Sequence, residues 1–184
     1  MLTTPEKAKS MTGGTIPDEQ LLPLLVAASA AIEERCRRIF KQQTYTETIN
    51  TLKGPYQHVR QYPVRAVLVV HDRNGNYIPG TVEIVEDSPG ILFNRQGWPQ
   101  GERAVTVSYE AGYILPEDEK EEMKANLPET LQYACILMAQ HLLRNPGVLS
   151  ERVGDISVTY EALNPSLPLP AAVEALIAPH IRIL

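Results

Sequence analysis

The stretch DEQLLPLLVAASAAIEERCRRIFKQQTYTETINT, residues 18–51, contains the change of pattern that decides the fold. Over its first part, apolar residues recur every three or four positions, which predicts an amphipathic helix near residues 18–40 with Asp18 as its N-cap. From Thr44 onward, β-forming residues alternate with a period of two, which predicts a strand. The helical stripe consists of Leu21, Leu25, Ala28, Ile32, Cys36 and Ile39.

The region before this helix is polar and contains the pair Gly13-Gly14. We interpret residues 1–16 as a flexible N-terminal arm without the apolar core of a signal peptide. Pro23 would remove one hydrogen bond from a helix interior. The helix therefore either starts near Gln20, which places Pro23 in the first turn, or bends at Pro23.

After the helix, short β-patterned runs separated by Gly, Pro and Asn continue to Tyr113. They predict a small antiparallel sheet or barrel-like lobe over residues 44–113, with a hairpin turn at Asn74-Gly75. The predicted strands are residues 44–51, 64–70, 81–85, 91–93 and 104–109.

The helical pattern returns with a long helix over residues 128–144, which opens at Pro128 and ends before Asn145-Pro146-Gly147. A strand near residues 156–160 and a short helix over residues 171–178 follow. We predict an α+β fold, with a helical frame and an inserted small antiparallel β lobe. Its divisions are the arm at 1–16, a main domain at 17–164 and a C-terminal arm at 165–184.

The bulk composition excludes several classes of protein. With 17 Lys and Arg against 22 Asp and Glu, the net charge is −5, which argues against binding nucleic acid by neutralising phosphates. No apolar run approaches the ~20 residues of a membrane span. The two cysteines, Cys36 and Cys135, lie in helical patterns, so we expect neither a disulfide framework nor secretion.

No catalytic, cofactor or metal site is evident, and we predict none. The four histidines are scattered singly, whereas zinc ligands come at short paired spacings. Glycine-rich phosphate loops and nucleophile elbows are absent from the sequence. The acidic run at residues 117–122 is typical of a solvated segment, because adjacent like charges repel and seek water.

Two other features have alternative interpretations. Arg35, Arg37 and Arg38 could bind phosphate, but we favour a role at the negative end of the helix dipole and pairing with nearby glutamates. Trp98 could stack on a ligand, although as the only tryptophan it more often anchors a core or a subunit contact.

Several segments, in order, resemble one family. AAIEERCRRIF at 30–40 is similar to the ending of its first helix. Tyr62-Pro63-Val64 resembles a strand-opening proline step, and VTVSYEAGY at 105–113 resembles a strand that leads into an aromatic turn. Leu127-Pro128-Glu129 opens a long helix, and ERVGDISVTY at 151–160 resembles a Gly-Asp loop with its strand. The family is that of the head–tail connector (adaptor, or head-completion) proteins of long-tailed phages and prophages.

The resemblance covers the chain from about residue 16 and implies a structural subunit, not an enzyme. Such subunits form a ring, often a dodecamer, beneath the portal protein in the virion neck, and are made in the bacterial host cytoplasm. The ring prolongs the DNA channel without specific DNA binding, and it receives the next tail-proximal protein, a stopper or tail terminator. No membrane contact is implied.

We expect the assembly contacts to lie in the Gly154-Asp155 loop and along the C-terminal arm. The apolar face of the short terminal helix would dock on the portal, so deleting residues 166–184 would leave a folded subunit that cannot bind it. The expected contact residues are Gly154, Asp155, Val173, Leu176, Ile177, Ile181, Ile183 and Leu184.

Three alternatives remain open. The chain could be a stopper or tail-completion protein of the same neck. It could be a β module that binds a small ligand, with Trp98 and Tyr109 lining a pocket. It could also be a hydrolase in which Asp155, beside Gly154, acts as nucleophile or base.

Overall fold

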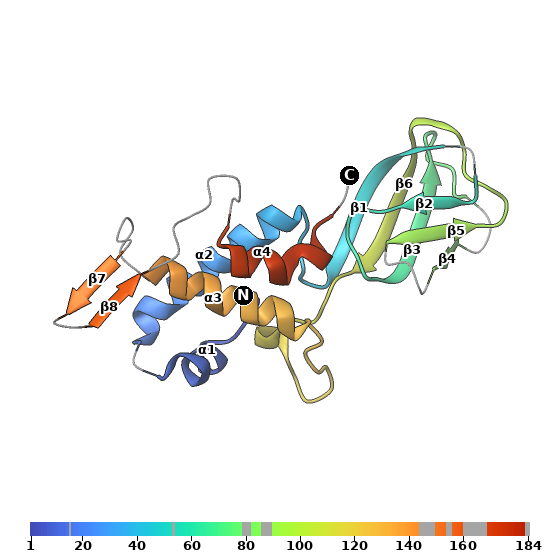
Figure 1. The fold of residues 1–184 in the computed structure, drawn as a ribbon. Helices are drawn as coiled ribbons and strands as arrows, with labels where there is room; N and C mark the ends of the chain where they lie inside the picture. The colour runs from blue at the N-terminus through green and yellow to red at the C-terminus, as the bar shows by residue number, and fades with distance from the viewer. Residues whose placement is uncertain are drawn as a thin grey trace. The chain divides into compact units, whose positions relative to one another are not determined.

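The computed structural model describes residues 1–14, 16–52, 54–78, 82–85, 90–143, 150–153, 156–159 and 169–182. The chain forms two compact units. Unit 1 comprises Met1–Arg38 with Leu115–Leu184, and unit 2 is Ile39–Ile114, close to the lobe predicted at 44–113. The fold is α+β, as the change of pattern after residue 40 predicts (Figure 1).

Unit 1 is built mainly from helices (Figure 1). Its elements are α1 (Pro5–Thr12), α2 (Asp18–Cys36), the 3-10 turn η1 (Pro116–Asp118), α3 (Glu129–Leu143), the hairpin β7 (Ser150–Val153) and β8 (Ile156–Thr159), α4 (Ala171–Ile177) and the 3-10 turn η2 (Ala178–His180). The long helices and the short terminal helix fall within a few residues of their predicted ranges.

Helix α2 begins at the predicted residue but differs from its prediction in its N-cap and in its C-terminal end. It begins at Asp18 after Pro17, which is the N-cap, and it accommodates Pro23 inside the helix. It ends at Cys36 because Arg37 takes a left-handed conformation with φ 55°, and the N–H of Arg37 bonds back to the last turn. Ile39, predicted as part of the stripe, therefore lies beyond the helix.

The N-terminal segment also differs, because the predicted flexible arm contains helix α1. Thr4 caps this helix by accepting a hydrogen bond from the Lys7 N–H at 3.3 Å, and Pro5 occupies its first turn. Leu2 and Ala8 are both 1% exposed, and the Leu2 N–H donates to Ser29 Oγ of α2 at 3.0 Å. The buried side chains of Leu2 and Ala8 and the capping Thr4 therefore order a segment whose other residues are mostly polar.

Unit 2 contains two three-stranded antiparallel sheets among its described residues. One has the order β1-β6-β3 and the other β2-β5-β4. The strands are β1 (Gln43–Thr51), β2 (Tyr56–His58), β3 (Val64–Asp72), β4 (Val82–Ile84), β5 (Ile91–Asn94) and β6 (Gly101–Ala111).

The turn and the strands predicted in unit 2 are present in the structure, which also contains one strand that is not predicted. Asn74 and Gly75 form the predicted turn, in which Asp72 Oδ1 accepts the N–H groups of Asn74 and Asn76, each at 2.8 Å. Strand β3 begins at Val64, directly after the Tyr62-Pro63 step. Strand β2 is not predicted, because its single buried side chain, Gln57, is polar and no buried apolar residue marks the strand.

Candidate assembly surfaces

The centre of unit 1 is the contact between α2 and α3. Ser29 Oγ of α2 lies 3.4 Å from Cys135 Sγ of α3, and the same thiol lies 3.7 Å from the Leu25 carbonyl oxygen. Leu25, Ile32 and Leu131 are fully buried, and Met138 is 8% exposed. The stripe predicted on α2, apart from Ile39, is therefore a core surface that packs against α3.

Helix α4 docks on the same core. Leu169, just before it, is buried, as are Val173 and Ile177. Glu174 on α4 is also buried, and its Oε1 accepts a hydrogen bond from Arg35 Nε of α2 at 2.7 Å. This ion pair raises the pKa of the Arg35 guanidinium. The predicted pairing of Arg35 with a neighbouring glutamate is therefore replaced by a partner 139 positions away.

The segment after α4 closes the end of α2. The Arg182 N–H donates to the Cys36 carbonyl oxygen at 3.1 Å, which satisfies one of the acceptors that a helix end leaves open. His180 Nε2 lies 3.3 Å from Thr130 Oγ1 at the start of α3. Burial and the charge of Arg38 lower the pKa of His180. This tail is thus tied to α2 and α3.

The residues predicted to contact the portal differ in their burial. Val173 and Ile177 belong to the core of their own chain, which corrects the expectation that the terminal helix presents them to a partner. Leu176 and Ile181 remain partly exposed. The other four predicted contacts, Gly154, Asp155, Ile183 and Leu184, lie outside the described residues.

The outer face of α2 is an apolar surface that the sequence patterns above do not single out. Leu22 is 38% exposed and Val26 is 54% exposed, and Pro23, Ala27 and Ala30 beside them are also exposed. From residue 21 to residue 32 the only polar side chain is Ser29, which is buried. A helix that is apolar all round is normally covered on every side. This run of twelve residues without a charge is the sequence signal that could have indicated an apolar outer face.

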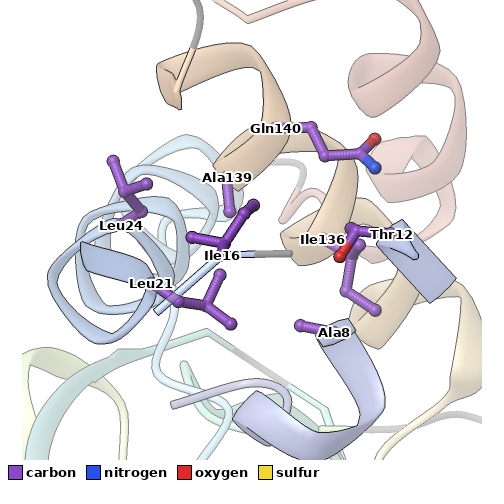
Figure 2. Close-up of a pocket in the computed structure, with 8 residues that line it drawn as sticks. All are labelled: Ala8, Thr12, Ile16, Leu21, Leu24, Ile136, Ala139 and Gln140. Carbon is purple, nitrogen blue, oxygen red and sulfur yellow. The ribbon is translucent and has the colours of Figure 1, made fainter. Parts of the chain in front are cut away.

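An apolar pocket lies between α1, α2 and α3. Figure 2 shows Ala8 and Thr12 from α1, and Leu21 and Leu24 from α2, gathered around Ile16. The α3 side is lined by Ile136, Ala139 and Gln140. Its lining is mainly apolar, and Thr12 and Gln140 are the two polar residues that line it. We assign it to helix packing.

Unit 2 places the two proposed pocket aromatics in its core. Trp98 is 5% exposed, and its Nε1 donates to the Pro55 carbonyl oxygen at 2.7 Å. Tyr109 is fully buried, and its hydroxyl donates to Glu47 Oε1 at 2.8 Å. Burial raises the pKa of the Tyr109 hydroxyl well above its usual range. Both rings therefore pack in the core of the β lobe.

Trp98→Phe is expected to lower the free energy of unfolding by roughly 1–2 kcal/mol, because it shrinks a buried ring and removes one of the two N–H groups that donate to the Pro55 carbonyl oxygen, leaving only that of Asn94. Calorimetric melting of wild type and variant measures the loss. Tyr56→Phe is the matched control, since Tyr56 is 57% exposed. Equal melting temperatures for Trp98→Phe and wild type would contradict the assigned role of the indole.

The two thiols are suited to packing and not to chemistry. Cys36 and Cys135 are both fully buried, and burial raises the pKa of each to about 11. Since the thiolate is the reactive form, both side chains are inert near neutral pH. Among the described residues, no group of three or more His, Cys, Asp or Glu could hold a metal ion.

In the folded protein, we expect neither thiol to react with Ellman's reagent at mildly alkaline pH. In concentrated guanidinium chloride both should react, because unfolding exposes them and restores their ordinary pKa. Rapid labelling of native protein would show that the α2–α3 contact opens readily.

Comparisons with known proteins identify the fold. No family model matches the sequence, and no curated protein does. Among solved structures, a chain in the neck of a native gene transfer agent (GTA) particle, computed with C12 symmetry, has a TM-score of 0.57 and 20% identity over 89% of this chain and 84% of that one. The described helices lack the combination of length and apolarity needed to cross a membrane.

Two further chains in GTA particle structures share this fold. A chain in the neck of an empty GTA particle, computed with C6 symmetry, has a TM-score of 0.55 and 21% identity over 93% of this chain and 83% of that one. A chain in the virion of a native gene transfer agent particle has a TM-score of 0.56 and 22% identity, over 92% and 81% of the two chains. The protein shares its fold with components of phage-like particles, which agrees with the resemblance to head–tail connectors.

Proposed function

We propose that this protein is a structural subunit of the neck between a phage-type head and its tail, and that it forms an adaptor ring beneath the portal. The observation that carries the proposal is the fold likeness, which spans 89% of this chain and includes a neck computed with C12 symmetry.

The chemistry of the described residues is consistent with a structural role. The ionisable groups with clearly shifted pKa values in the core, Cys36, Cys135 and Tyr109, are explained by burial in packed helices and sheets. A catalytic group would instead face a cleft beside a second functional group. The net charge of −5 also suits a channel wall past which DNA slides without adhering.

The portal contact would use the partly exposed residues Leu176 and Ile181, together with the Gly154-Asp155 loop. Leu176 lies on α4 and Ile181 directly after η2, so both belong to the C-terminal segment that docks on α2 and α3. Apolar side chains on a segment already docked on its own core make better docking points than those on a free tail, because less entropy is lost on binding.

A pull-down with the portal protein from the same genome tests the proposal directly. We expect co-purification with the portal and the presence of the subunit in assembled particles. Leu176→Glu and Ile181→Glu should each weaken binding at least tenfold, whereas Ala172→Glu, on an exposed position of the same helix, should not. Absence of the protein from particles would refute a neck role.

A second candidate is a stopper or tail-completion protein, one layer further from the head. The fold likeness supports a neck component and does not distinguish these layers. A subunit that binds a tail-side protein, and binds portal no better than an unrelated control protein does, would belong to that layer.

A further inference from the structure

Unit 1 carries a second apolar strip, on α3. Tyr133 is 42% exposed and Leu137 is half-buried, and the two lie one helical turn apart. Gln140 continues this side of the helix without adding a charge. We call Tyr133 and Leu137 the α3 strip, and Leu22, Val26, Ala27 and Ala30 the α2 strip.

The two strips lie on different faces of the helix pair. Helix α3 meets α2 at Cys135, which lies against the Leu25 carbonyl oxygen and Ser29 Oγ. Tyr133 and Leu137 are each two residues from Cys135, just over half a revolution, so the α3 strip lies on the far side of its helix from this contact. On α2, Ala27 and Ala30 lie roughly 140–160° around the helix from the buried Leu25, whereas Val26 and Leu22 lie on its flank, at about 100° and 60°.

From these two separate strips we infer that the α2 strip of one copy packs against the α3 strip of the next copy in the ring; this inference rests on the proposed function. A cyclic ring needs two different complementary surfaces on each subunit, because the contact is head-to-tail. Solved chains with this fold come from neck structures computed with C12 and C6 symmetry. Two different apolar strips on one pair of helices meet that requirement.

The chemistry of the strips favours a second copy as the occupant. Each copy carries a net charge of −5, so two copies repel each other overall. Neither strip contains a charged residue, so here the copies approach without that cost. Ala27 and Ala30 are small enough for a neighbouring helix to come close, and the Tyr133 ring supplies the large apolar area that anchors protein interfaces.

A cysteine pair tests the contact in assembled particles. Ala30→Cys and Tyr133→Cys are introduced together, and purified particles are treated with a short bis-maleimide and run on a denaturing gel. We expect a ladder of dimers, trimers and higher multimers, since within one chain the two positions face away from each other. Each single variant should give at most a dimer, and the native thiols are buried and do not interfere.

The outcomes separate this inference from the proposed function. If particles contain the double variant but give no ladder, the strip contact is wrong and the neck role stands. If the wild-type protein is absent from particles, the neck role fails, and the inference fails with it. As a second measurement, Val26→Glu should reduce incorporation at least tenfold while circular dichroism shows an unchanged fold, whereas Ala172→Glu should be incorporated normally. Normal incorporation of Val26→Glu would also overturn the inference.

Discussion

Gly112→Ala is expected to lower the free energy of unfolding of unit 2 by about 3–5 kcal/mol. Gly112 has φ 107°, a backbone conformation that residues with a side chain rarely adopt. A Cβ atom there would lie 2.6 Å from the Lys41 carbonyl oxygen and 2.8 Å from that of Phe40. Both obstacles are backbone atoms. The Tyr113 N–H also bonds to the Phe40 carbonyl oxygen at 2.7 Å, so the segments cannot separate without losing that hydrogen bond.

Urea unfolding followed by tryptophan fluorescence measures this loss, because Trp98 is the only tryptophan and lies in unit 2. Gly75→Ala is the matched control. Gly75 also has a positive φ, 81°, but a Cβ atom added there would have no neighbouring atom within 4 Å. It should cost only about 1 kcal/mol, the strain of the conformation itself. If the two variants lose equal stability, close backbone approach is not what requires Gly112.

Much of the fold could be predicted from local pattern. Helix α3 is expected at 128–144 and spans Glu129–Leu143, because its apolar stripe and its flanking prolines are all local signals. The β lobe is expected at 44–113, and unit 2 spans Ile39–Ile114. Its long strands alternate over enough residues for a period of two to be visible, as in β1.

Features that depend on distant partners could not be predicted in this way. Glu174 looks like the solubilising residue of the terminal helix, yet it is buried against Arg35. Leu2 looks like part of a polar arm, yet its side chain is buried and its N–H bonds to Ser29. In each case the residue type or its polar surroundings indicate solvent, and only the partner from another helix changes the environment.

The apolar stripe of a helix also cannot reveal what it faces. Val173 and Ile177 are predicted from the sequence to form a surface for the portal. The same residues of a short terminal helix could equally dock on the core of their own chain, and the pattern does not distinguish the two. The structure places them in the core. Conversely, the exposed Leu22 and Val26 escape notice in the sequence, because they lie beside the stripe that is assigned to the core.

The burial of α4 reverses the expectation for a C-terminal deletion. Removing residues 169–184 takes away Leu169, Val173 and Ile177, which are 7%, 1% and 0% exposed. At roughly 1.5–3 kcal/mol for each buried side chain, the loss is comparable with the whole stability of many domains. Arg35 would also lose its carboxylate partner, and the Cys36 carbonyl oxygen its donor. We therefore expect unit 1 of the truncated chain to unfold, and not to remain a folded subunit that merely fails to bind portal.

Far-ultraviolet circular dichroism should show the loss of helix, while the Trp98 unfolding transition of unit 2 should persist, because that core draws on residues of unit 2 alone. The matched control removes only residues 183–184, which keeps α4 and the hydrogen bond from the Arg182 N–H; it should melt as wild type does. A deletion of residues 169–184 that stays fully helical would show that α4 contributes little to the core.

If unit 1 unfolds as expected, a deletion cannot locate the portal contact, because loss of binding would only report loss of structure. Point variants at Leu176 and Ile181, whose side chains are partly exposed, are then the informative probes of that surface.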